Sequence, residues 1–131
     1  AIMLQCGADA LEEDPLSRLA LSNNAHRAVV AALMGLAPRL IVLGGGGYNP
    51  WSVARCWAGV WGALNGHALP ERLPDAAEAV LRRLSYHRAA GRNPPEHWFT
   101  TLADAPRPGV VRAVVRRAAA AALEALAEPV S

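Results

Sequence analysis

Two short runs of apolar residues stand out along the chain, at 2–4 (Ile-Met-Leu) and at 40–43 (Leu-Ile-Val-Leu). The second run is β-branched in its middle and stops at four consecutive glycines. Short, continuous apolar runs bounded by turn residues are typical of strands that are buried on both faces. The pattern therefore predicts two buried strands at these positions.

Helical periodicity follows each run. Between 23 and 36, apolar side chains recur every three to four positions behind Asn23 or Asn24, either of which is a suitable N-cap. A second helix is expected over 50–64, where Asn49 is the cap and Pro50 takes the first helical position. Strand, helix, strand and helix in this order predict an α/β fold with a parallel sheet and right-handed crossovers.

Prolines interrupt the chain after Gly66, and the pattern becomes less regular. We expect a helix over 73–84, an irregular segment over 88–107 and an Ala-rich helix over 110–126. The apolar stripe of the last helix predicts that it covers an edge or a face of the sheet. Residues 1–66 thus form a βαβα part, and residues 67–131 form an extension that packs on the same domain.

Length and composition narrow the class of protein. With 131 residues, 53% apolar and 18% charged, the chain fits one globular domain at most. A formal net charge of +2 does not indicate a nucleic-acid or membrane-surface partner. Cys6 and Cys56 lack the spacing of a disulfide framework or a zinc motif, which favours a reducing cytoplasm. Because the sequence opens without Met in a predicted strand, we expect it to be a piece of a longer protein.

Candidate chemistry lies in the loops that follow the two strands, where open α/β folds bind their ligands. Asp9 follows the first strand, and Tyr48 follows the glycines at 44–47. A dinucleotide-binding GxGxxG motif fails, because its third glycine falls on Asn49 or Pro50. Taken alone, Asp9 is commonly a turn residue or helix cap, and Tyr48 a partly buried aromatic residue.

Four strings in these regions resemble the C-terminal part of the catalytic domain of zinc-dependent histone deacetylases. They are Gln-Cys-Gly-Ala-Asp at 5–9, Asp-Pro-Leu at 14–16, Leu-Gly-Gly-Gly-Gly-Tyr at 43–48 and Ala-Arg-Cys-Trp at 54–57. Their order and the 39-residue interval from Asp9 to Tyr48 also match. Pro-Glu-His-Trp-Phe at 95–99 looks more like the bacterial acetoin-utilization deacetylase branch. The resemblance implies the arginase/deacetylase fold, a parallel sheet sandwiched by helices.

The resemblance also implies roles for individual residues. Asp9 corresponds to one of the family's zinc ligands, and Tyr48 to the residue that polarises the acyl carbonyl and stabilises the oxyanion. Leu16 falls at a position that lines the acyl-lysine tunnel, and Gly46 and Gly47 fall at the glycine wall of that tunnel.

Other parts of the family's site have no counterpart in the sequence. The remaining zinc ligands and the catalytic histidines belong to an Asp-x-His pair and a His-His pair, and neither string occurs here. We therefore expect the N-terminal portion of the same domain to supply them, and the isolated chain to be inactive. Two basic positions that bind inositol phosphate in some eukaryotic members are Pro15 and Trp51 here, which argues against regulation by that ligand.

Several polar residues are expected to be structural. Asp14 reads as a turn residue, Arg55 as a partner of a carboxylate or helix end, and Cys56 as a buried apolar residue. His26 has no carboxylate or histidine at i+4, and His67, His87 and His97 lie in the irregular C-terminal part, so we expect solvent-facing or capping roles for all four.

Three functions remain open at this stage. The first is part of a zinc-dependent deacetylase that hydrolyses acetyl-lysine-type amides to a free amine and acetate. The second is an acetylpolyamine amidohydrolase, and the third is a non-catalytic remnant that serves as a structural or interaction module. An acetylated lysine or a small acetylated amine is the expected ligand, without nucleic-acid or membrane binding.

Overall fold

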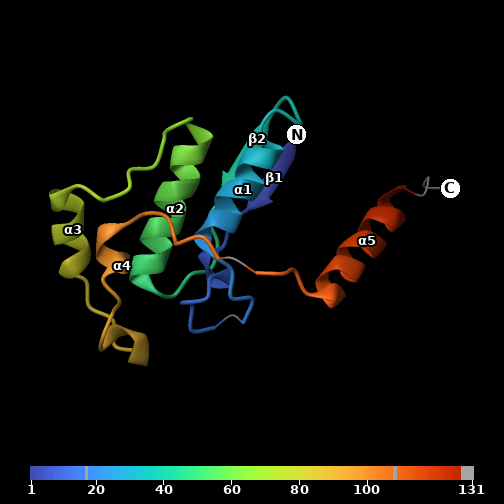
Figure 1. Cartoon of the computed structure of the whole chain (residues 1–131). Helices are drawn as coiled ribbons and strands as arrows, with labels where there is room; N and C mark the ends of the chain where they lie inside the picture. Colours follow the sequence, from blue (N-terminus) through green and yellow to red (C-terminus); the bar gives the residue numbers. More distant parts are fainter. Residues whose placement is uncertain (17, 108, 128–131) are drawn as a thin grey trace.

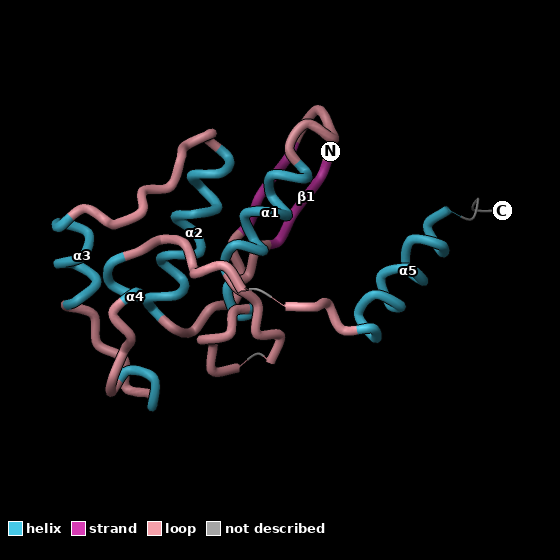
Figure 2. Tube along the Cα trace, in the orientation of Figure 1, coloured by secondary structure: helices cyan, strands magenta, loops and turns pink. Residues whose placement is uncertain are grey.

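The computed structural model describes residues 1–16, 18–107 and 109–127, and its first half is built on a parallel strand pair. Strand β1 (Ile2–Gln5) pairs with β2 (Leu40–Leu43), with Ile2 opposite Leu40 and Gln5 opposite Leu43. Helix α1 (Asn23–Leu33) connects the strands, and α2 (Pro50–Leu64) follows β2 (Figures 1 and 2). The predicted βαβα order is confirmed.

The start of α2 follows the prediction, whereas the start of α1 does not. Asn49 Oδ1 accepts hydrogen bonds from the backbone N–H groups of Trp51 (3.1 Å) and Ser52 (3.5 Å). The N-cap of α1 is Ser22, whose side chain accepts from the N–H of Asn24 at 3.1 Å. The predicted Asn cap is wrong because the Asn23 side chain instead donates to the carbonyl of Leu102 at 2.7 Å.

The core of this half lies on one face of the strand pair. Leu4 and Val42 pack there against a buried cluster of Cys6, Val30 from α1 and Val60 from α2. Side chains that alternate onto the other face are exposed, namely Met3 (70%), Ile41 (49%) and Leu43 (45%). The prediction that both faces are buried is therefore wrong for the described residues, because α1 and α2 share the same side.

A second core surrounds Trp51 at the start of α2. It gathers residues from α3 (Asp75–Arg82) and from α4 (His97–Thr100), with the short helix η2 (Ala89–Gly91) between them. The Trp51 ring stacks on Trp98 at 5.5 Å, and its Nε1 donates to the carbonyl of Leu81 at 2.8 Å. The helix expected over 73–84 is confirmed with shorter bounds, and the segment expected to be irregular contains η2 and α4.

Helix α5 (Ala113–Ala127) projects away from the rest of the molecule (Figure 1). Its described apolar side chains are exposed, including Val114 (58%) and Val115 (44%). The predicted helix is confirmed, but the predicted packing on the sheet is not observed, and the Leu126 side chain of the predicted stripe lies outside the described part. Among the described residues, no helix combines the length and apolar character needed to cross a bilayer.

Candidate active site

Hydrogen bonds join the two loops that follow β1 and β2. The parallel pairing continues beyond the strands, where the N–H of Cys6 donates to the carbonyl of Leu43 at 2.8 Å. The N–H groups of Ala8 and Asp9, in the short helix η1 (Ala8–Ala10), both reach the carbonyl of Gly46, at 2.6 and 3.2 Å. The Asp9 loop and the glycine loop thus lie side by side at the carboxyl end of the sheet, as their order predicted.

Close approach of the two loops explains two of the glycines. A Cβ at Gly46 would overlap the Asp9 carboxylate, so any larger residue would displace that side chain. Gly47 has φ +150°, and its Cβ would come within 2.6 Å of Val53 Cγ2 and 2.9 Å of Ala8 Cβ. The half-buried Asp9 carboxylate therefore packs directly against glycine backbone.

Asp14 fixes the backbone that carries Tyr48. This buried carboxylate accepts the N–H of Tyr48 at 2.7 Å through Oδ2 and the N–H of Leu16 at 2.9 Å through Oδ1. The side chains of Tyr48 and Leu16 are exposed, at 50% and 60%. Asp14 has the structural turn role expected of it, and it also ties Leu16 to the loop of Tyr48.

His26 lies behind the Asp9 loop and corrects the expectation of a solvent-facing or capping residue. The ring is 9% exposed, and Nε2 lies 2.9 Å from the carbonyl oxygen of Gly7. Nδ1 is buried and has no hydrogen-bond partner among the described residues. The spacing to Val30, one helical turn further along the same buried face, is the sequence signal that could have placed it.

Arg55 of α2 anchors the part of the chain that follows Gly66, which we call the tail. Its guanidinium is 1% exposed and lies 2.9 Å from Oδ1 of Asp104, and its Nε donates to the carbonyl of Thr101 at 2.7 Å. The expected pairing with a carboxylate is confirmed. The identity of that carboxylate was not predictable, because nothing in the local pattern connects positions 55 and 104.

The cysteines and the remaining histidines show no nucleophile. Cys56 is buried, and desolvation raises the pKa of its thiol to about 12, so the thiol stays protonated at neutral pH. Burial also raises the pKa of Cys6. His67, His87 and His97 are exposed as expected, and His97 also lies near two carboxylates, Glu13 and Asp104.

Comparison with known proteins relates these loops to one family. Residues 1–64 match the histone deacetylase domain. The chain is 49% identical over 77 residues to "Putative histone deacetylase 2" of Caenorhabditis elegans, covering 59% of this chain and 15% of that protein. It is 43% identical over 74 residues to "Histone deacetylase 3" of Oryza sativa subsp. japonica, covering 56% and 14%.

Solved structures extend the similarity beyond residue 64. The crystal structure of an HDAC homolog from Aquifex aeolicus superposes with a TM-score of 0.79 at 33% identity, covering 92% of this chain and 32% of that one. A structure described as an HDAC homolog complexed with SAHA matches with the same values. The chain therefore has the arginase/deacetylase fold, and it spans about a third of the length of these structures.

Proposed function

We propose that the chain, whose residues 1–64 match the histone deacetylase domain, belongs to the histone deacetylase family and forms the C-terminal part of a zinc-dependent deacetylase domain. The domain would hydrolyse acetyl-lysine-type amides to a free amine and acetate. The observation that carries the proposal is the joining of the Asp9 loop and the Tyr48 loop through the carbonyl of Gly46. The Pro-Glu-His-Trp-Phe string at 95–99 supports placement in the acetoin-utilization branch.

Asp9 is the residue of this chain that would hold the zinc ion. Its carboxylate is half-buried at a strand end beside glycines, and an oxygen ligand of this kind suits a catalytic zinc. When bound, zinc lowers the pKa of a coordinated water and polarises the acyl carbonyl. Because the sequence contains neither Asp-x-His nor His-His, the other ligands and the proton-transferring histidines are assigned to the N-terminal portion of the domain.

Tyr48 is the proposed catalytic residue of this chain. Its hydroxyl would donate a hydrogen bond to the oxygen of the acyl group as negative charge develops there. Asp14 is a positioning residue, because it holds the Tyr48 backbone at 2.7 Å and the Leu16 backbone at 2.9 Å. Leu16, Gly46 and Gly47 are proposed to line the tunnel for the acyl-lysine chain.

The exposed face of the strand pair is the proposed contact with the rest of the domain. Met3, Ile41 and Leu43 project from this face, and an open apolar sheet surface of this kind calls for a covering layer. This chain aligns with 32% of the matching HDAC homolog structure, so about two thirds of that homolog lies outside the alignment, which supports the N-terminal portion of the domain as the occupant.

A non-catalytic role is the second function that an observation favours, because this chain offers Asp9 alone as a catalytic zinc ligand.

An activity assay separates the alternatives. We expect the longer protein to release acetate from an acetyl-lysine peptide in a chelator-sensitive reaction, and faster than from an acetylpolyamine. The reverse preference would indicate an acetylpolyamine amidohydrolase, and inactivity on both would indicate a structural module. Chelator-sensitive turnover by residues 1–131 alone would contradict the proposal that the N-terminal portion of the domain supplies the other zinc ligands and the catalytic histidines.

A further inference from the structure

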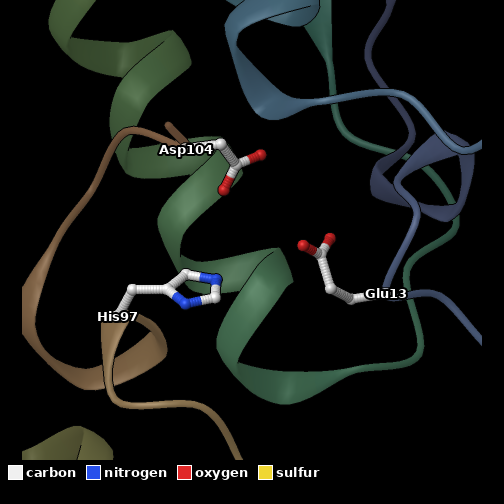
Figure 3. Close-up of side chains that lie close together, drawn as sticks. All are labelled: Glu13, His97 and Asp104. Carbon is white, nitrogen blue, oxygen red and sulfur yellow. The ribbon is translucent and has the colours of Figure 1, made fainter. Parts of the chain in front are cut away.

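We propose that Glu13, His97 and Asp104 form a binding site for a divalent transition-metal ion of the zinc class, separate from the site at Asp9. One ligand atom from each residue lies within 4.8 Å of those of the other two. Figure 3 shows the three side chains pointing toward one another, Glu13 from the loop after η1 and the other two from α4 and the loop that follows it. The proposed deacetylase chemistry uses none of them.

Unbalanced negative charge is the first argument for a cation here. Asp104 is 8% exposed, and Glu13 is half-buried. Glu13 Oε2 is buried and has no hydrogen-bond partner among the described residues, whereas Asp104 Oδ1 is paired with Arg55 at 2.9 Å. Two carboxylates thus face a single buried guanidinium, and a bound cation would balance the charge that remains.

The set of donor atoms decides which ions fit. One imidazole nitrogen with two carboxylate oxygens is suited to zinc, cobalt or manganese, whereas calcium and magnesium prefer oxygen ligands throughout. Bonds of about 2.0–2.2 Å in a tetrahedral site separate ligand atoms by about 3.4 Å, so small side-chain movements would close the site.

The three ligands differ in how firmly they are held, in a way that suits such closure. Asp104 is held by Asn23, whose N–H donates to Oδ2 at 2.8 Å and whose Oδ1 accepts the N–H of Asp104 at 3.0 Å. His97 is exposed at the start of α4, and no hydrogen bond to its ring is found among the described residues. The firmly held Asp104 and the more exposed His97 would bind the ion from the tail, and Glu13 would bind it from the loop after η1.

Binding would join two parts of the molecule. Glu13 belongs to the loop that leads from Asp9 to Leu16, and its carbonyl accepts Nδ2 of Asn49 at 3.2 Å. His97 and Asp104 belong to the tail. The ion would therefore fasten the tail to the loop beside the candidate active site and stabilise both.

Cobalt(II) titration of the full 131-residue chain tests the proposal, in an Asp9→Asn background that removes the other metal ligand. We expect one Co²⁺ to bind with visible d–d absorption, and His97→Ala to weaken binding at least tenfold. Since His97 is exposed, this variant should retain the fold. His87→Ala and Glu12→Gln are the matched controls and should bind as the parent does. Equal affinity of the His97→Ala variant, or no absorption at millimolar cobalt, would overturn the proposal.

Thermal melting of Glu13→Gln provides the second measurement. With zinc the parent should gain melting temperature and the variant should not. An equal gain in both proteins would also overturn the proposal.

Discussion

The loops around Asp9 and the tail after Gly66 are held by different kinds of contact. The Asp9 loop and the glycine loop are joined by backbone hydrogen bonds and by glycines that allow close approach. The tail is held by large side chains of α2, with Trp51 in its core and Arg55 paired to Asp104. Substitutions in the first region should therefore change the geometry of the site, and substitutions in the second should change stability.

The largest expected effect is on the tail. Arg55→Ala leaves the Asp104 carboxylate buried without its cation, and breaking a buried pair in this way costs about 3–5 kcal/mol. The free energy of unfolding, measured by urea denaturation, should fall by that amount. Arg92→Ala, at an exposed position, is the control and should change it little. A loss below about 1 kcal/mol for Arg55→Ala would remove the proposed anchor.

Tyr48→Phe tests the other region. Removing the hydroxyl should lower kcat of the longer protein roughly 100- to 1000-fold, because the oxyanion loses a donor. The unfolding free energy should be almost unchanged, since the Tyr48 side chain is 50% exposed. Full turnover in the variant would show that the phenol is not catalytic.

Gly47→Ala should have an intermediate effect on both properties. With φ at +150° and Ala8 and Val53 close to the new Cβ, the substitution strains the loop by about 1–3 kcal/mol. We expect a lower melting temperature together with reduced turnover in the longer protein. Gly66 also has a positive φ, at +69°, but no atom lies within 4 Å of the position that a Cβ would take. Gly66→Ala is therefore the control that adds backbone strain without crowding. Equal effects of the two substitutions would contradict the crowding argument.

The smallest expected effect concerns the surface of the tail. Hydrogen bonding to Arg82, together with the charge of Arg72, lowers the pKa of Glu78 in the folded state. Its contribution to stability is therefore present above the unfolded pKa and is lost as the pH falls through the folded value. Glu78→Gln should flatten the acid side of the melting-temperature profile slightly. An unchanged profile would show that this exposed network contributes nothing measurable.

Local pattern predicted much of the fold. Periodicity located both strands, α1, α2, α3 and α5, and the Asn49 cap located the start of α2, because these features depend on neighbouring residues; η2 and α4 lie in the segment that was predicted to be irregular. The face of the sheet left uncovered was not predictable, since an apolar run of four residues is the same whether one layer or two layers cover it. The Ser22 cap was missed because Asn23 is used in a contact with Leu102.

The candidate site was likewise predicted from the sequence only in part. The order of the strands predicted that the loops of Asp9 and Tyr48 would be neighbours, and the structure has them hydrogen-bonded through Gly46. The roles of Asp9 as a zinc ligand, Tyr48 as the catalytic residue and Leu16 as part of the tunnel lining rest on family resemblance and remain predictions. The cluster of Glu13, His97 and Asp104 was missed because it depends on the folded path of the tail, for which the sequence carries no local signal.

The most direct test of the central claim is the zinc content and kcat of Asp9→Ala and Tyr48→Phe in the longer protein. We predict that Asp9→Ala loses both catalytic zinc and turnover, and that Tyr48→Phe keeps its zinc while turnover falls roughly 100- to 1000-fold. Retention of catalytic zinc and activity by Asp9→Ala would contradict the assignment of these two loops to one deacetylase site.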